Sequence, residues 1–368
     1  MQYERSLFMK QENNNEKRLK LGEDSFGRDI SLPMDGQMMT NYHMIITGES
    51  GYGKTFFLKL LARQLYLMGY TVIIIDASSS YLPDNNEEFF RHASVVNVYE
   101  DGLEIDFLIQ NQLSFQVKEK VVDATRRVAD LLALVFELRG GKQKAILYSA
   151  LKELMEKEGD GDIDMKLKRL GEILGADESE SGMALALKLA SFLDLELFKT
   201  PTEKWNVYDE ALKIFNLQYF DDGTKKMLTD VILWDIWNQA VQSGNPDSKV
   251  IVILDEAQNL NHSSSSPIAK MLTEGRKFGI GLWISTQFLR KRFKDEAISR
   301  LKQAATRICF RPDDSEANGI AREIDYEKRR EWAEVLKGLG RGECVALFSE
   351  NVADSSRPEE IKKRIKIV

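Results

Sequence analysis

The chain has 368 residues, of which 43% are hydrophobic and 9% aromatic, so it can bury a large core and is not disordered by composition. A formal net charge of −7 excludes a protein that binds nucleic acid with its whole surface, so any such binding requires a local basic patch. Two cysteines exclude a disulfide framework, no apolar run is long enough to span a membrane, and no signal peptide is visible; we therefore expect a cytoplasmic protein without a membrane partner.

The first part of the chain predicts the start of a parallel α/β sheet. Residues 1–25 are charged and lack periodicity, so we interpret them as an N-terminal arm. Met44–Thr47 is an apolar run that leads into a glycine-rich loop, residues 56–67 have apolar side chains at helical spacing, and residues 71–75 form a β-branched run. This strand–loop–helix–strand order is typical of a mostly parallel sheet with flanking helices.

A helical insertion is predicted in the middle of the chain. Apolar residues recur at helical spacing in four stretches, which are residues 117–138, 144–157, 184–197 and 225–241. Apolar runs typical of buried strands follow at Val250–Leu254, 281–285, Thr306–Phe310 and 344–348. The predicted division is an N-terminal arm (1–25), a first part of the α/β core (26–110), the helical insertion (111–245), and a second part of the core with the C-terminal tail (246–368).

The loop after the first apolar run matches the P-loop pattern G-x-x-x-x-G-K-[ST] in full. Its glycines let the backbone N–H groups surround a phosphate, and the following helix presents its N-terminus to the same group. Lys54 is expected to neutralise phosphate charge, and the Thr55 hydroxyl to coordinate Mg²⁺. The alternative, a chance glycine-rich turn, does not explain the strand before and the helix after. The residues predicted to contact ATP are Gly48, Glu49, Ser50, Gly51, Tyr52, Gly53, Lys54, Thr55 and Phe56.

Two further polar signals follow buried strands. Asp255 and Glu256 end the run Val250–Leu254, where Asp255 suits a Mg²⁺ ligand and Glu256 a base that polarises the attacking water. The alternative for Asp255 is a helix cap. Gln287 follows the next run, where it could sense the γ-phosphate or orient the water, or else only cap a turn.

The segments GESGYGKT, VIVILDEAQ, EGRKFGIGLWISTQ and TRICF together resemble the HerA–FtsK superfamily of ring-forming, DNA-pumping ATPases. The resemblance covers roughly residues 26–110 and 246–350. It implies a P-loop NTPase fold of the RecA-like kind, with an extra strand between the P-loop strand and the Asp-Glu strand. It also implies hexamers that bind ATP–Mg²⁺ between subunits and act on double-stranded DNA.

The sequence departs from the family pattern in two places. HerA itself has an N-terminal β-barrel, whereas fewer than 50 residues precede the P-loop here, and FtsK-type members usually have a proline soon after Thr-Gln, where this chain has Phe288 and Leu289. The resemblance is therefore consistent with the ATPase part of a larger protein, such as a DptH-type restriction or phage-defence protein that works with a nuclease.

A basic stretch supports a nucleic-acid partner. Residues 276–311 contain ten Lys and Arg residues and two acidic ones, in a chain that is acidic as a whole. The cluster Arg290, Lys291, Arg292 and Lys294 has Phe288 and Phe293 interleaved, a composition that can track a phosphate backbone. The alternative is a solvated helix face with ion pairs, and for the basic run at residues 362–366 a solvated tail is the favoured interpretation.

Either of two arginines could complete the charge around the γ-phosphate of a neighbouring subunit. Arg307 lies in the TRICF segment and Arg276 in the Glu-Gly-Arg-Lys segment before Gln287. The alternative for each is an ion pair within its own subunit.

The leading functional hypothesis is an ATP-hydrolysing hexameric motor that translocates double-stranded DNA. A conjugation or type IV secretion-like ATPase that moves protein or nucleoprotein shares the same signals, and a nucleotide-dependent switch subunit is a third hypothesis. A GTPase is disfavoured because no Asn-Lys-x-Asp motif is present. A small-molecule kinase is disfavoured because such a site seldom needs an Asp-Glu pair with a distal Gln.

Overall fold

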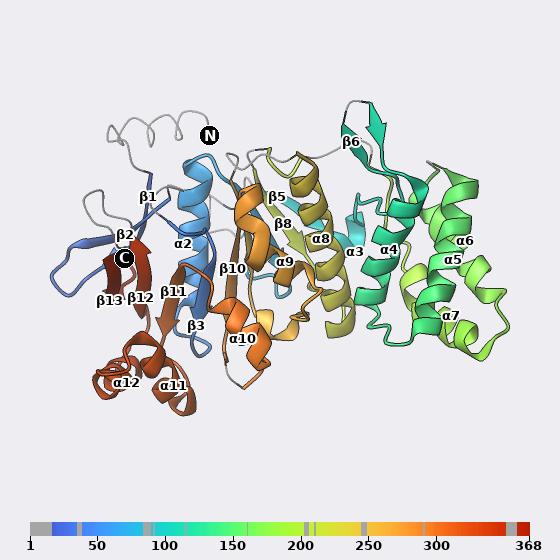
Figure 1. Ribbon diagram of the computed structural model, residues 1–368. Coiled ribbons are helices and arrows are strands. Elements are labelled where there is room, and N and C mark those ends of the chain that lie inside the picture. The colour runs from blue at the N-terminus through green and yellow to red at the C-terminus, as the bar shows by residue number, and fades with distance from the viewer. Residues whose placement is uncertain are drawn as a thin grey trace.

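The fold is built on one large mixed sheet (Figure 1). The computed structural model describes residues 17–34, 39–83, 90, 93–114, 116–159, 161–201, 206–209, 211–243, 249–289, 291–350 and 359–368. The sheet has eleven strands, which in spatial order are β2 (Asp29–Pro33), β1 (Arg18–Glu23), β13 (Glu359–Lys366), β12 (Glu343–Glu350), β11 (Thr306–Phe310), β3 (Met44–Thr47), β10 (Ile280–Thr286), β9 (Val250–Leu254), β4 (Thr71–Asp76), β8 (Leu212–Asn216) and β5 (Ser94–Asn97).

The strands from β11 to β5 are all parallel, and those from β11 to β2 pair antiparallel. Every residue of β3, β9 and β10 is buried, because parallel strands in the middle of a sheet are covered on both faces. β10 lies between β3 and β9, as the resemblance implied. The predicted mostly parallel α/β fold is therefore confirmed, and the connections that follow β3, β9 and β10 all begin at the same edge of the sheet.

Helices cover both faces of this sheet. They are α2 (Lys54–Leu67), α3 (Val98–Asp101), α4 (Val121–Val135), α5 (Gly141–Glu158), α6 (Ile163–Gly175), α7 (Glu180–Leu193), α8 (Asp222–Ser243), α9 (Pro267–Glu274), α10 (Asp295–Leu301), α11 (Asp314–Ile324) and α12 (Arg329–Lys337), with the 3-10 turns η2 (Ala257–Asn259) and η3 (Gly275–Phe278). A small ribbon of β6 (Gln112–Ser114) and β7 (Val117–Lys118) stands apart from the main sheet. No helix within the described residues is long and apolar enough to cross a membrane.

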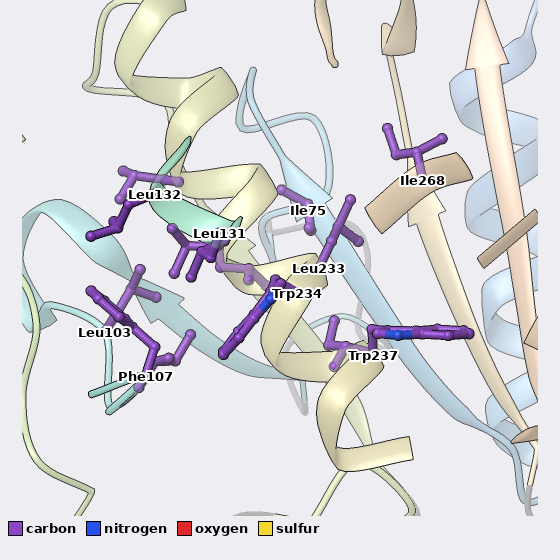
Figure 2. Packing of buried hydrophobic residues seen from close by; sticks show 14 of the residues in the cluster. Ile75, Leu103, Phe107, Leu131, Leu132, Leu233, Trp234, Trp237 and Ile268 are labelled. Carbon is purple, nitrogen blue, oxygen red and sulfur yellow. The ribbon is translucent and has the colours of Figure 1, made fainter. Parts of the chain in front are cut away.

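Two cores result, one on each face of the sheet. α2 packs on one face, where Phe57 and Leu61 join side chains of the strands. α8 packs on the other face and is buried on nearly all sides, since α4 rests against its outer surface and α5–α7 pack behind α4 (Figure 1). Figure 2 shows Trp234 and Leu233 of α8 in one cluster with Leu131 of α4 and Ile75 of β4, so α8 joins the helical layer to the sheet.

The helical insertion is smaller than the predicted range 111–245. β8 lies inside that range but pairs with β4 and β5 in the main sheet, and α8 packs directly on the sheet. The free-standing helical part is therefore α4–α7. Sequence reasoning missed β8 because its five residues, with Lys213 among them, show neither a long apolar run nor a helical period. It also missed α6, which begins at an Asp162 cap that accepts hydrogen bonds from the first-turn amides.

The two ends of the chain differ from the prediction. Residues 18–23 of the expected N-terminal arm form β1, while residues 1–16 lie outside the described residues. The expected solvated tail at residues 362–366 is part of β13, which pairs with both β12 and β1. Most of its side chains point outward and are charged, and Ile365 is buried, so only a sparse period-two pattern marked the strand.

Candidate functional site

The P-loop is shaped by glycines in a backbone conformation that other residues rarely adopt. Gly48 has φ 141°, and a Cβ there would lie 2.6 Å from the Cβ of Phe310. Gly53 has φ 111° and caps the N-terminus of α2. The loop therefore turns tightly from β3 into α2 and presents the start of a helix, as a phosphate-binding loop requires.

Lys54 lies inside this loop rather than in solvent. Its Nζ donates hydrogen bonds to the carbonyl oxygens of Gly48 and Glu49, at 2.7 and 2.9 Å. The side chain is buried, and burial lowers the pKa of the ammonium from its ordinary value, although the carboxylates of Glu256 and Asp255 act in the opposite direction. A cation held in this way is positioned to exchange the two carbonyls for an anionic ligand.

The sequence did not predict that two C-terminal segments hold the P-loop in place. The Arg311 carbonyl, just after β11, accepts from the Glu49 amide at 2.8 Å, and its guanidinium lies 5.6 Å from the centre of the Tyr52 ring. Arg341 Nε donates to the Gly51 carbonyl at 3.1 Å. No local motif marks either arginine, because each reaches the loop from a different strand connection.

The two predicted metal ligands are brought together. Thr55 Oγ1 donates to Asp255 Oδ2 at 2.8 Å, although the residues are 200 positions apart. The same oxygen accepts from the hydroxyl of Tyr81 at 2.9 Å. Tyr81 is fully buried, and this burial, together with the nearby Asp255 carboxylate, raises the pKa of its phenol well above the ordinary value, so the group remains a neutral donor.

Tyr81 is itself positioned by a turn that follows β4. Asp76 at the end of that strand is buried, and its carboxylate accepts from the amides of Ser78 at 3.0 Å and Tyr81 at 2.9 Å. An aspartate that accepts from the amide two residues on is typical of a turn of this kind. Asp76 was the one sequence signal that could have pointed to this loop, since it ends the strand next to β9.

Glu256 and Gln287 form the second predicted pair. Gln287 Nε2 donates to both oxygens of the Glu256 carboxylate, at 3.0 and 2.9 Å. Glu256 has φ 52°, a left-handed conformation that turns its side chain away from the line of β9.

Gln258 completes this arrangement and was not predicted. Its Nε2 also donates to Glu256, while its Oε1 accepts from Thr286 Oγ1 at 2.9 Å. The carboxylate of Glu256 is thus held by two amides from two different connections. Gln258 belongs to the DEAQ segment, but nothing in its spacing distinguished it from an ordinary loop residue.

The two candidate arginines do not contact the P-loop of their own subunit. Arg307 on β11 is partly exposed and lies 3.9 Å from Glu323 of α11. Arg276 is exposed in η3, just before β10, so it lies at the end of the sheet opposite the P-loop. Phe56, predicted to contact ATP, is 57% exposed on the first turn of α2.

The basic stretch is only partly available to a ligand. Lys291 pairs with Asp313 at 3.1 Å, and Phe293 is buried against the ring of His262, so the interpretation of Phe293 as an interleaved contact is wrong. Arg292 and Lys294 are exposed, whereas Arg290 lies outside the described residues.

The P-loop follows β3, the Asp255–Glu256 pair follows β9, and Gln287 follows β10, which lies between these two strands. This arrangement defines an ATPase of the P-loop NTPase class. The model of the family described as the central domain of helicase HerA matches residues 19–236, and the chain belongs to this family. The resemblance to the HerA–FtsK superfamily is thereby confirmed.

Solved structures share this fold, and one curated relative is similar in sequence. VirB4 of Thermoanaerobacter pseudethanolicus superposes with a TM-score of 0.70 over 97% of both chains, at 18% identity. The plasmid coupling protein TrwB, in a complex with ADP and Mg²⁺, gives 0.61 over 89% of this chain and 86% of its own, at 15% identity. A "probable helicase" of Methanocaldococcus jannaschii is 20% identical in an alignment 353 residues long, which covers 89% of this chain but only 64% of that protein.

Proposed function

We propose that this chain is an ATP-driven motor that moves double-stranded DNA. The observation that carries the proposal is the junction of Thr55 with Asp255 at 2.8 Å, next to the Glu256–Gln287 pair, at one edge of the sheet beside a complete P-loop. A binder that only senses nucleotide has no need of a carboxylate held so close to the metal ligands.

The residues present fit ATP and Mg²⁺. The Thr55 hydroxyl and the Asp255 carboxylate are oxygen ligands of the type Mg²⁺ prefers, and the buried Lys54 ammonium offers a charge for the phosphates. The bound metal ion would supply neutralisation of phosphate charge. Glu256 then accepts the proton of the attacking water, and Gln287 orients both the carboxylate and the water.

DNA as the substrate is supported by the family and by local charge. The family that matches is described as the central domain of a helicase, and the basic residues gather in one stretch of an acidic chain. We further propose a homo-hexamer with ATP between subunits, because Arg307 and Arg276 lie away from their own P-loop. The sequence resemblance further supports a protein that acts in the cytoplasm, in DNA processing or phage defence, together with a nuclease.

A second candidate is a conjugation-like ATPase that moves protein or nucleoprotein. The superposition with VirB4 over 97% of both chains favours it. The two candidates differ in what stimulates hydrolysis, since only a DNA motor requires naked duplex DNA to raise the rate.

The deciding experiment measures ATP hydrolysis with and without duplex DNA at several salt concentrations, together with the mass of the assembly. Lys54→Ala serves as the control and should abolish ATP binding or turnover while the thermal melt stays unchanged. Stimulation by duplex DNA that disappears in high salt supports the DNA motor. No stimulation by any DNA overturns it, and unimpaired turnover in Lys54→Ala overturns the site.

A further inference from the structure

A groove with a volume of about 960 Å³ lies between the helical layer and the ATPase core. Its walls come from α4, the start of α5, α8, the segment from η2 to α9, and the connection into α10 (Figure 1). This groove is separate from the P-loop, but Gln258, which holds Glu256, lines it.

The groove is strongly basic. Eight Lys and Arg side chains and three acidic ones line it, so the walls carry a positive excess in a chain of net charge −7. Lys144, Lys270, Arg292 and Lys294 are exposed there and make no ion pair within the described part of the chain. They come from three separate elements, and only the exposed Asp130 stands opposite them without an ion pair among the described residues.

Other basic residues of the wall have structural partners. Arg127 is held by Glu119 at 2.8 Å, and Arg300 is held by Glu296 at 2.6 Å. These pairs fix the shape of the wall, while the four uncompensated cations remain for a ligand. Unpaired cations that line the same groove repel one another, so an anion that binds there removes an unfavourable interaction.

The chemistry of the walls fits the phosphate backbone of duplex DNA better than a single strand. Single-strand sites use exposed aromatic rings on which bases stack. The aromatic side chains Trp234, Trp237 and Phe293 line this groove but are buried, and Figure 2 shows the two tryptophans within the packing around α8. Exposed hydroxyls at Ser263 and Ser264 instead offer donors of the kind that contact phosphates.

We propose that this groove binds the phosphodiester backbone of duplex DNA, and that Gln258 transmits its occupancy to Glu256. The inference rests on the proposed function. The segment after Glu256 runs along the groove, and it is tied to α10, which follows Lys294, because Arg300 donates to the His262 carbonyl at 2.6 Å. The ring of His262 in turn contacts the Ala257 carbonyl at 2.6 Å. A phosphate that draws Lys270 or Lys294 inward moves this segment and Gln258 with it.

The sign of the coupling follows from the hydrogen bonds. The amide of Gln258 occupies a Glu256 oxygen, and therefore competes with a water molecule for that oxygen. Movement of Gln258 leaves that oxygen with one amide donor in place of two and so opens a position for water, while Gln287 keeps the carboxylate oriented. Hydrolysis without DNA is then restrained, and DNA in the groove releases the restraint.

The first test removes the four cations together, as Lys144→Gln, Lys270→Gln, Arg292→Gln and Lys294→Gln in the full chain. The matched control removes four exposed cations outside the groove, at Lys328, Arg330, Lys363 and Lys366. In the groove variant, the salt slope of DNA binding should fall by about one unit for each phosphate that the protein no longer binds. The variant should keep the ATPase rate measured without DNA and should not be stimulated by DNA.

The outcomes separate the two proposals. If the unaltered protein neither binds DNA nor responds to it, the proposed function fails. If it does both, and the groove variant matches the control in salt slope and stimulation, only the groove inference is overturned. Preferential competition by an acidic peptide over duplex DNA also overturns it.

The second test addresses the relay with Gln258→Leu and Gln258→Glu. Both should raise the DNA-free kcat toward the DNA-stimulated level, with the KM for ATP unchanged, so that the stimulation ratio falls to about one. The basis is the loss of a hydrogen bond that competes with water. A hydrogen bond of about 1.4 kcal/mol changes an equilibrium about tenfold. DNA binding should stay intact. A stimulation ratio equal to that of the unaltered protein in either folded variant overturns the relay.

Discussion

The hydroxyl of Tyr81 and the hydroxyl of Thr55 donate to the same oxygen of Asp255, at 2.9 and 2.8 Å. Thr55 can leave that oxygen for a metal ion, but Tyr81 is fully buried and tied back to Asp76 through its backbone amide at 2.9 Å. Tyr81 therefore fixes the orientation of Asp255 before any nucleotide is present.

Tyr81→Phe should weaken Mg²⁺ dependence without unfolding the protein. The ring keeps its packing and loses only the donor to Asp255. Removal of such an outer partner typically costs about 10- to 100-fold in metal affinity. The measurement is ATPase rate against Mg²⁺ concentration at saturating ATP. Tyr148→Phe, on α5 of the helical layer, is the matched control and should titrate like the unaltered protein. An unchanged Mg²⁺ midpoint in Tyr81→Phe contradicts this role for Tyr81.

Glu256→Gln should bind ATP normally and hydrolyse it at least ~10²-fold more slowly, since that is the usual loss when a general base is removed. The amide keeps the size of the side chain beside Gln287 and Gln258, so the surrounding turn should persist. Nucleotide binding and single-turnover hydrolysis are measured side by side. Glu274→Gln, exposed at the other end of the sheet, should hydrolyse ATP at the normal rate. Normal turnover in Glu256→Gln would show that another group organises the water.

The pH dependence of the free energy of unfolding should show that His43 is neutral in the folded protein. Burial lowers the pKa of this imidazole to about 4 from 6.5, and its Nδ1 accepts from the Leu282 amide at 3.0 Å. As pH falls below 6.5, the unfolded chain takes up a proton that the folded chain excludes, so stability falls through this window. The contribution of His43 to the free energy of unfolding should therefore fall by about 2 kcal/mol between pH 7 and pH 5.

His43→Asn provides the comparison, because its amide oxygen can accept the same hydrogen bond without titrating. Urea unfolding at both pH values should show that the stability difference between the two proteins shifts by about that amount in favour of the variant at pH 5. Parallel pH dependences in the two proteins would contradict a neutral, buried His43.

The sequence predicted the strands and helix around the P-loop because these elements follow one another along the chain. Met44–Thr47 and Val250–Leu254 were located to the residue, since buried parallel strands are continuous apolar runs. The meeting of Thr55 with Asp255 was also predictable, because parallel strands end at the same edge of the sheet. In contrast, β13 carries only two apolar residues on its inner face, so its charge pattern resembled a solvated tail.

The residues that sequence reasoning missed act over long distances in the chain. Tyr81 reaches Asp255 from the connection after a different strand, and Arg341 reaches Gly51 from nearly 300 positions away. Gln258 sits beside Glu256, but its role depends on Thr286 of the neighbouring strand. No local period or spacing encodes such contacts, which exist only once the sheet has brought the connections together.

Arg307 is the residue we expect to act on the nucleotide of a neighbouring subunit. Its ion pair with Glu323 joins partly exposed groups at 3.9 Å, so it contributes too little stability to explain an arginine at this position. Arg307→Ala should bind ATP normally and hydrolyse it about 10³–10⁵-fold more slowly. Glu323→Gln, which breaks the ion pair but keeps the arginine, is the matched control and should hydrolyse at the normal rate.

Mixing Arg307→Ala with Lys54→Ala subunits should then restore part of the activity, because a Lys54→Ala subunit lends its Arg307 to a neighbour with an intact P-loop. If rings shown by mass to be mixed recover nothing, the trans role passes to Arg276; if Glu323→Gln is as slow as Arg307→Ala, the arginine serves only its own subunit.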